Sequence, residues 1–476
     1  MRRRGVLAAL AALAPLASTA AQAPTPPPAA PATATEDAAR AFPSDSEVLA
    51  VIRRRVEEKR SAGIVVGLLE PDGRTRVVAF GDPGPGRPPL DANSVFEIGS
   101  ITKVFTATLL AELAQQRAVS LDDPAQRYLP AAVHLPTRSG KAITLRTLSE
   151  QNSGLPRMPS NFHPADEANP YADYTVAQMY DFLSHYQLTR DPGERFEYSN
   201  LGVGLLGHVL ALATDRPYEA LERERVWQPL GMTHTAITLT PWMREHLALG
   251  HDEGGRVVAN WDLPTLAGAG AIRSTAADML KFAAANVRPR DDALGRAMTM
   301  AQTPRAPAGS PAMAIGLNWL TRYAGADTIV WHNGGTGGYR TFLGLQPTRR
   351  RAVVVLTNTT GAGADDIGMH LLAPSLPLTP APRAHTAIEL PATVLARYVG
   401  TYRLGPAMTF DVTLAGGALY VRPTGQPTVR LWPERETDFF VREVDAQVTF
   451  VRDSGGAVSS FVLHQGGRDQ TARRVR

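Results

Sequence analysis

FEIGSITK, residues 96–103, is the stretch that decides the fold of this 476-residue chain. Apolar side chains recur at helical spacing directly after it, at Val104, Ala107, Ala111 and Ala114. This spacing predicts a helix that begins at or just after Ser100. At positions i and i+3 of such a helix, the Ser100 hydroxyl and the Lys103 amine share one face.

A serine at a helix N-terminus is suited to nucleophilic attack, because free backbone N–H groups and the positive end of the helix dipole can stabilise an oxyanion. A lysine can act as its base only where burial or neighbouring cations lower the lysine pKa, since an ammonium has no lone pair. We therefore expect Ser100 to be a nucleophile and Lys103 its base. The alternative is structural, with Ser100 as a helix cap and Lys103 in solvent, because a bare S-x-x-K motif also arises by chance.

A second motif, Tyr198-Ser199-Asn200, follows a Pro192-Gly193 turn and opens an apolar helical run. A tyrosine near an ammonium can be a phenolate and relay a proton, and an amide two residues on can orient the lysine or a substrate carbonyl. Taken alone, Tyr198 also suits a core aromatic residue.

A third motif, HNGGTGG at residues 332–338, follows a predicted strand that ends at Trp331. Glycines here would let a substrate backbone lie against the strand edge, and the N–H of Gly335 is a candidate second oxyanion donor. A glycine-rich hairpin turn is the alternative interpretation.

The order and separation of the three motifs resemble the penicillin-recognising serine hydrolases, which include class C β-lactamases, D-alanyl-D-alanine carboxypeptidases and related esterases. The resemblance covers residues 45–372 and is supported by matches at 143–146, 153–156, 229–232, 269–275 and 353–358. Residues 171–174 and the run HNGGTGGYRTF are most similar to the carboxypeptidase/endopeptidase branch that trims peptidoglycan.

The resemblance implies catalytic roles for Ser100, Lys103, Tyr198 and His332, and substrate-binding roles for Asn200, Asn333, Gly334 and Gly335. Ser100 would attack the carbonyl, Lys103 with Tyr198 would move the proton, and the N–H groups of Ser100 and Gly335 would form the oxyanion hole. In class C β-lactamases the third motif begins with lysine, whereas His332 stands there in this chain, and no lysine follows Lys281. Because a neutral imidazole anchors a carboxylate less strongly than an ammonium, this difference disfavours efficient β-lactam hydrolysis.

The expected fold is α/β (α+β), similar to the β-lactamase/transpeptidase α/β/α sandwich, with an antiparallel sheet, a helical subdomain and the active site at their junction. A β-hairpin is predicted from Ile64–Leu69 and Arg76–Phe80, and further strands at Gly316–Leu320, Thr328–Trp331, Thr341–Leu345 and Ala352–Asn358. Short alternating runs after the proline-rich stretch 371–391 predict a small all-β domain, which resembles the lipocalin-like barrel appended to some of these hydrolases.

The predicted organisation is a signal peptide at 1–23, a Pro/Ala-rich tether at 24–44, the hydrolase domain at 45–372, a linker at 373–390 and the β domain at 391–476. Arg2–Arg4, the apolar run Val6–Leu16 and the small residues after it predict cleavage of the signal peptide and a periplasmic or secreted protein without a membrane anchor. Sec and twin-arginine export both fit.

Composition narrows the classes of function. A net charge of +4 gives no reason to expect a nucleic-acid partner, and the absence of cysteine excludes a disulfide framework. The 11 histidines form no close metal-binding motif, and no serine lies in G-x-S-x-G, so a metallohydrolase and an α/β-hydrolase are disfavoured. No metal or cofactor is expected, and the pattern gives no indication of oligomeric state.

The expected function is acylation and deacylation at Ser100 with a D-alanyl peptide of peptidoglycan or a β-lactam as substrate. A carboxylesterase of the same fold is one alternative, because an ester needs less protonation of its leaving group than an amide. A penicillin-binding sensor without turnover is the other, and long-lived stoichiometric acylation would favour it.

Overall fold

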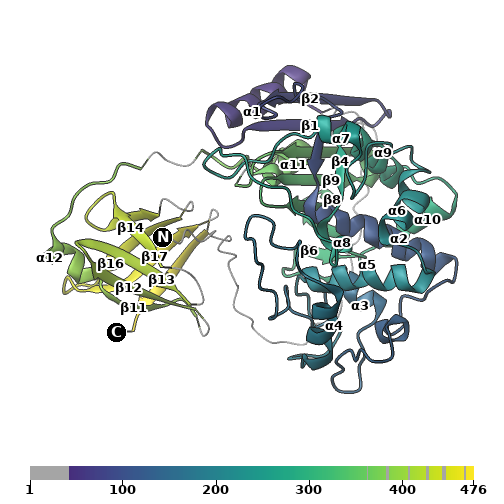
Figure 1. The fold of residues 1–476 in the computed structure, drawn as a ribbon. Coiled ribbons are helices and arrows are strands. Elements are labelled where there is room, and N and C mark those ends of the chain that lie inside the picture. Colours follow the sequence, from purple (N-terminus) through teal and green to yellow (C-terminus); the bar gives the residue numbers. More distant parts are fainter. Residues whose placement is uncertain are drawn as a thin grey trace. The chain divides into compact units, whose positions relative to one another are not determined.

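The computed structural model describes residues 42–361, 363–381, 385–405, 408–424, 428–441, 446–465 and 468–475. The chain forms two compact units that meet in sequence between Thr379 and Pro380 (Figure 1). The predicted signal peptide and residues 24–41 of the predicted tether lie outside the described residues. In the part of the chain that is described, none of the helices has the length and apolar character needed to cross a bilayer.

The larger unit is built on an eight-stranded antiparallel sheet with the order β2-β1-β10-β9-β8-β7-β6-β5. Its strands are β1 (Gly63–Leu69), β2 (Thr75–Gly81), β5 (Ala306–Pro307), β6 (Met313–Ile315), β7 (Leu320–Ala324), β8 (Asp327–Gly335), β9 (Arg340–Gln346) and β10 (Arg351–Thr357). β1 and β2 pair antiparallel from Gly63↔Gly81 to Leu69↔Thr75, which confirms the predicted hairpin.

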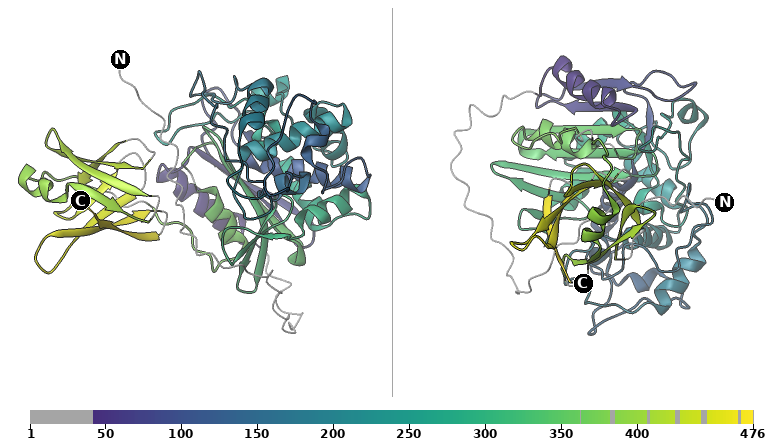
Figure 2. Two further views of the ribbon diagram at one scale, coloured as in Figure 1. Left: turned by 90° about the horizontal axis from the view of Figure 1, so that it is seen from below. Right: turned by 90° about the vertical axis from the view of Figure 1, so that its left-hand side faces the viewer.

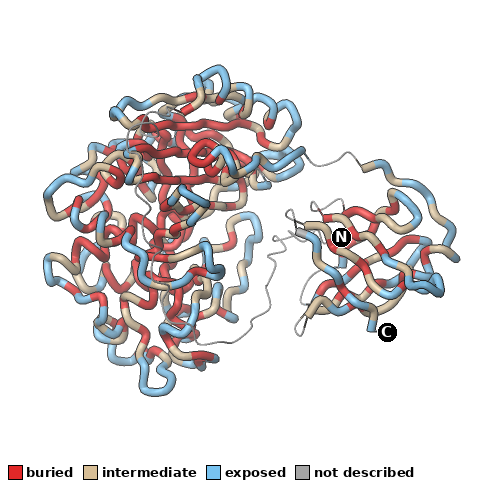
Figure 3. The backbone as a smooth tube through the Cα atoms, turned by 180° about the vertical axis from the view of Figure 1, so that it is seen from behind, coloured by how far each residue is buried: buried red, intermediate tan, exposed pale blue. Residues whose placement is uncertain are grey.

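Successive side chains of the central strands point to opposite faces of the sheet, so the buried residues form two cores, one on each face. On β1, Val66 and its neighbours at i±2 pack with α1 (Asp45–Glu57) and α11 (Ala364–Leu372), whereas Val65 and Leu69 pack on the side of α9 (Ala276–Val287). Figure 2 shows helices on both sides of the sheet, and Figure 3 shows the buried strands between them. This arrangement is the expected α/β/α sandwich.

The segment between β2 and β5 is mainly helical, as expected. It contains η1 (Gly99–Ile101), α2 (Thr102–Gln115), η2 (Ala125–Tyr128), α3 (Leu145–Ser149), α4 (Val176–His185), α5 (Asn200–Thr214), α6 (Tyr218–Glu222), η3 (Arg223–Trp227), α7 (Pro241–Glu245), α8 (Ala267–Gly270), α9 and α10 (Ala293–Gln302). A two-stranded sheet of β3 (Val95–Glu97) and β4 (Arg273–Thr275) leads into η1, so Ser100 lies where this helical region meets the main sheet.

The prediction of a strand at Gly316–Leu320 is wrong except for its last residue. The backbone turns back there, with Gly316 N–H donating to Trp319 O at 2.8 Å and Asn318 at a φ of 55°. Asn318 is held by long-range contacts, because its N–H and its amide both reach Ser149, at 2.8 and 3.1 Å. β8 also extends past Trp331 to Gly335, so the glycine-rich motif begins within the strand.

The smaller unit contains a closed eight-stranded antiparallel barrel, in which β11 pairs with both β12 and β18. After α12 (Ala392–Leu395) and η5 (Ala396–Tyr398), its strands are β11 (Gly400–Arg403), β12 (Thr409–Ala415), β13 (Ala418–Pro423), β14 (Val429–Pro433), β15 (Asp438–Val441), β16 (Ala446–Arg452), β17 (Val458–Gln465) and β18 (Arg468–Arg474). Its interior is filled by aromatic side chains such as Tyr398, Tyr402, Phe450 and Phe461. The predicted barrel is confirmed.

Candidate active site

Ser100 lies in η1, on the turn that joins β3 to α2. Gly99 precedes it with a φ of 51°, and a Cβ at Gly99 would lie 2.6 Å from the backbone nitrogen of Gly335. Only glycine fits both the left-handed conformation and this close approach. A Cβ at Gly334 would likewise clash with the Ile98 carbonyl oxygen. The turn that carries Ser100 therefore packs directly on the backbone at the end of β8.

Lys103 is fully buried on the first turn of α2, and its amine has three polar contacts. Nζ lies 2.9 Å from Ser100 Oγ, 2.9 Å from Asn200 Oδ1 and 2.6 Å from the Ala269 carbonyl oxygen. Burial, together with the positive charge of Arg157, holds the pKa of Lys103 well below its usual range. The amine is therefore favoured in its neutral form.

The partners of the neutral amine define the direction of its lone pair. The Asn200 amide oxygen and the Ala269 carbonyl oxygen can only accept hydrogen bonds, so they take the two N–H groups of the amine. The lone pair is then left for the remaining contact, the Ser100 hydroxyl. This is the geometry of a base that takes the proton of Ser100.

Tyr198 lies beside this pair. Its ring centre is 4.9 Å from Lys103 Nζ and 5.1 Å from the guanidinium carbon of Arg157. Burial raises the pKa of Tyr198 to about 12, although a hydrogen bond with Ser100 and the charge of Arg157 act in the opposite direction. Burial thus acts against the charged forms of both the phenol and the amine, and so against the phenolate considered from the sequence.

The Tyr198-Ser199-Asn200 segment is fixed by residues that the sequence did not indicate. Gln151 accepts from Ser199 N–H through Oε1 at 2.6 Å and donates to Asn318 Oδ1 at 2.9 Å. The Ser199 hydroxyl donates to the Pro156 carbonyl at 2.6 Å and caps α5 by accepting from Gly202 N–H at 2.8 Å. These bonds fix the position of Asn200 at the start of α5, where its amide reaches Lys103.

His332 lies on β8 with its ring 6.2 Å from that of Tyr198, and it is buried. Burial is the main influence that lowers the pKa of His332 to about 3, even though Nδ1 lies 2.6 Å from the Asn333 carbonyl oxygen. The imidazole is therefore neutral at ordinary pH. It offers hydrogen bonding at the site but no positive charge.

The other predicted residues of the third motif have different surroundings. The Asn333 amide donates to Asp365 on α11 at 2.6 Å, and side chains alternate along a strand, so Asn333 points to the face opposite that of His332. The structure thus places the Asn333 side chain against Asp365 and does not bring it to Ser100. Gly334 packs closely against Ile98, and the backbone of Gly335 lies next to Gly99 in the turn that carries Ser100.

Two aromatic residues border the site, and sequence reasoning did not single out either as functional. The Tyr171 hydroxyl lies 3.8 Å from Met158 Sδ, and the Tyr171 ring lies 5.3 Å from that of Trp261. Burial raises the pKa of Tyr171 against the opposing effects of Arg157 and Asn200. A Cβ at Gly337 would lie 2.6 Å from Trp261 Nε1. This aromatic pair therefore joins the Asn200 side of the site to the glycine-rich segment after β8.

A hydrogen-bonded chain of buried polar groups lies one turn along α2 from Lys103. Thr106 Oγ1 donates to the Gly268 carbonyl at 2.8 Å and lies 2.6 Å from the Tyr218 hydroxyl. That hydroxyl in turn lies 3.0 Å from Glu222 Oε1. Glu222 is fully buried, and burial raises the pKa of its carboxyl to about 8. The chain connects α2 to α8, whose Ala269 carbonyl contacts the Lys103 amine.

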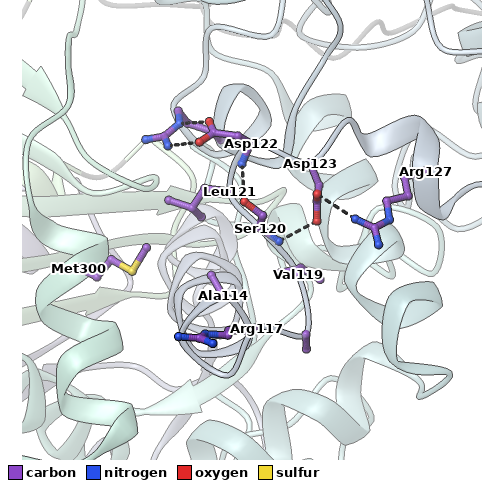
Figure 4. Close-up of a pocket in the computed structure, with 11 residues that line it drawn as sticks. Ala114, Arg117, Val119, Ser120, Leu121, Asp122, Asp123, Arg127 and Met300 are labelled. Atoms are coloured by element: carbon purple, nitrogen blue, oxygen red, sulfur yellow. Dashed lines mark hydrogen bonds and ion pairs between the residues drawn. The ribbon is translucent and has the colours of Figure 1, made fainter.

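A surface pocket of about 450 Å³ lies away from this chemistry, at the C-terminal end of α2 (Figure 4). Its rim includes Arg146 paired with Asp122 at 2.7 Å and Arg127 paired with Asp123 at 3.1 Å. The carboxylates here are satisfied by arginines, and none of the residues that line the pocket belongs to the three motifs. Among the residues that are described, no group of three His, Asp or Glu side chains is arranged to hold a metal ion.

An antiparallel sheet flanked by helices, with a Ser-x-x-Lys pair where the sheet meets the helical region, defines a penicillin-recognising serine hydrolase. The chain belongs to the beta-lactamase family, whose model matches residues 48–374. Residues 384–474 match a second family, described as a domain of unknown function (DUF3471).

Among curated proteins, the D-alanyl-D-alanine-carboxypeptidase/endopeptidase AmpH of Escherichia coli K12 is 32% identical over 314 residues, which are 62% of this chain and 79% of that protein. Penicillin-binding protein 4* of Bacillus subtilis is 27% identical over 419 residues, 82% of this chain and 89% of the relative. These relatives support assignment of the chain to the β-lactamase and D-alanyl-D-alanine carboxypeptidase type of serine hydrolase.

Solved structures support the fold. The β-lactamase/D-alanine carboxypeptidase from Yersinia pestis superposes with a TM-score of 0.61 at 24% identity. The match covers 69% of this chain and 96% of the Yersinia chain. The octameric penicillin-binding protein homologue from Pyrococcus abyssi has the same TM-score of 0.61 at 23% identity, with 90% of this chain and 99% of its own covered.

Proposed function

We propose that the chain is an exported serine hydrolase that acts through an acyl-enzyme on peptides that end in D-alanine. The observation that carries the proposal is the environment of Lys103. A buried amine with two acceptor-only partners keeps its lone pair for the Ser100 hydroxyl. A solvated helix lysine, which is the structural alternative, has no such environment.

In the proposed acylation, Ser100 Oγ attacks the carbonyl carbon while its proton passes to Lys103 Nζ. The negative charge that develops on the carbonyl oxygen is stabilised by the N–H groups of Ser100 and Gly335. Asn200 holds the substrate amide on the acyl side. Lys103 then returns a proton through the Tyr198 hydroxyl to the leaving nitrogen, so the C–N bond breaks and a neutral amine leaves.

In deacylation a water molecule attacks the ester carbonyl, and its proton passes to the Lys103–Tyr198 pair. The same pair then returns a proton to Ser100 Oγ as the C–O bond breaks. The phenol is suited to this relay because its raised pKa keeps it protonated between the two steps.

A D-alanyl peptide is preferred over a β-lactam for two reasons. The named relative AmpH is a D-alanyl-D-alanine-carboxypeptidase/endopeptidase. His332 is neutral where class C β-lactamases have a lysine, so this position departs from the β-lactamase pattern and provides no charge for the carboxylate of either substrate. The same neutrality favours ester hydrolysis as a second activity, because a simple ester carries no carboxylate to be anchored.

The test is a paired assay of purified protein, with D-alanine release from a muropeptide pentapeptide beside nitrocefin hydrolysis, and with Ser100→Ala as the control. D-alanine release with slow or stalled nitrocefin is the expected result. Fast nitrocefin turnover with little D-alanine release would instead identify a β-lactamase, and long-lived acylation without turnover of either would identify a sensor. Location in the periplasm or outside the cell is checked by fractionation.

A further inference from the structure

We propose that Arg157 binds a carboxylate on the leaving-group part of the substrate and selects for substrates that carry one. The inference rests on the proposed function, because it assigns the leaving group to the side of Tyr198. Arg157 lies in the loop between α3 and α4, its side chain is exposed, and its guanidinium carbon is 5.1 Å from the Tyr198 ring centre.

The position fits the chemistry of a terminal D-alanine. The carboxylate carbon of such a leaving group is separated from the scissile nitrogen by a single carbon atom. The Tyr198 hydroxyl delivers the proton to that nitrogen in the proposed mechanism, so a cation beside Tyr198 lies within reach of the carboxylate. A guanidinium can meet both carboxylate oxygens with parallel N–H donors.

Among the residues that the structure describes, no carboxylate forms an ion pair with the Arg157 guanidinium, which instead contacts the uncharged ring of Tyr198. Its charge nevertheless extends into the site, where it adds to the effect of burial in lowering the pKa of Lys103 and opposes the effect of burial on the pKa of Tyr198. An exposed cation beside the Tyr198 ring, without a carboxylate partner, is available for an anionic ligand.

The backbone of Arg157 is fixed relative to the catalytic groups. Its carbonyl oxygen accepts from Asn200 N–H at 3.0 Å and from Leu201 N–H at 3.2 Å, and the preceding Pro156 carbonyl accepts from Ser199. Only the side chain is therefore free to adjust to a ligand. A fixed attachment point reduces the entropy cost of holding the carboxylate.

The other cations near the site are already engaged. Arg340 lies across Gly335, its Nη1 approaches the Thr336 and Tyr339 carbonyl oxygens at 3.4 Å, and Asp365 and Glu253 contribute opposing charge. His332 is neutral, and Lys103 is buried with its donors used. Among the described residues around the site, Arg157 is therefore the cation without a carboxylate or carbonyl partner for its guanidinium.

The test uses two aryl esters with the same acyl group, a 3-carboxyphenyl ester and the matching phenyl ester, so that only the leaving group differs. Wild type, Arg157→Gln and Arg157→Lys are compared by kcat/KM. Loss of a charge-assisted hydrogen-bond pair should lower kcat/KM for the carboxylated ester about 10-fold to 100-fold in Arg157→Gln. The phenyl ester should change by less than about threefold, and Arg157→Lys should recover part of the loss.

Several outcomes would overturn the assignment: an equal fall for both esters, no fall for either, or no acylation by either ester in the wild type. An equal fall with the acidic limb of the pH–rate profile moved to higher pH would mean that Arg157 acts only by lowering the pKa of Lys103. Failure of the proposed function is separate. If the wild type released no D-alanine while the ester ratio changed as expected, the peptide substrate would be wrong and the carboxylate site would stand.

Discussion

Replacement of Lys103 by methionine tests the role of the buried amine most directly. Methionine fills a similar volume without a base, so the Ser100 proton has no acceptor and general-base catalysis, about 100-fold to 10,000-fold, should be lost. The Asn200 and Ala269 oxygens lose their hydrogen-bond donor, which lowers the free energy of unfolding by about 1–3 kcal/mol for each oxygen. Burial of an apolar methionine in place of a polar amine offsets part of this loss. The fold should therefore survive with a modest fall in stability.

The assay is rapid-quench measurement of the acylation rate constant, with intact-protein mass spectrometry to count the acyl groups formed. Lys281→Met is the matched control, because Lys281 also donates to a backbone carbonyl, that of Gly231 at 2.6 Å, but pairs with Asp278 rather than with a serine. The proposed role of Lys103 is refuted if Lys103→Met acylates within about threefold of wild type, or if only the substrate dissociation constant increases.

Three further changes have defined outcomes. Gln151→Ala removes the acceptor of the Ser199 N–H and should lower kcat more than it changes KM, measured with any accepted ester; an effect on KM alone would contradict the positioning role. Gly99→Ala strains a φ of 51° against Gly335 and should lower acylation at least about 100-fold while the protein still folds, as followed by mass spectrometry and circular dichroism. For Glu222, with a pKa near 8 in the folded chain and near 4.5 otherwise, the folded state holds the proton more tightly, so stability falls as pH rises from about 5 to about 8. Glu222→Gln should remove that part of the pH dependence of urea unfolding, and identical slopes in both proteins would show that the carboxyl does not titrate there.

Much of the fold follows from patterns that are local in the sequence. The apolar spacing after Ser100 predicts α2, and the alternating runs on either side of the Pro71–Gly73 turn predict the β1–β2 hairpin. The predicted strand at Gly316–Leu320 fails because the conformation of Asn318 is decided by Ser149, which is far away in the sequence. A residue held by a distant partner leaves no periodic signal of its own.

At the site, too, the residues that could be predicted are those marked by a local sequence pattern, and the others depend on tertiary contacts. Ser100 and Lys103 are recognisable because their spacing on one helix already brings them together, and Asn200 because it belongs to a compact motif. The third partner of the lysine is the Ala269 backbone carbonyl, which every residue possesses and no sequence pattern can mark. Arg157 was likewise missed, since its relation to Tyr198 arises only after the loop has packed on the start of α5.

The contact between Gly99 and Gly335 has a consequence for how such an enzyme can diversify. No side chain separates the two backbones, so the distance from the main chain of the Ser100 turn to the Gly335 N–H is set by main-chain atoms alone. Substitutions elsewhere around the cleft can then alter which acyl or leaving group is accepted without changing this span. The main-chain geometry at this contact therefore stays constant, and substrate preference can change during evolution through substitutions elsewhere around the site.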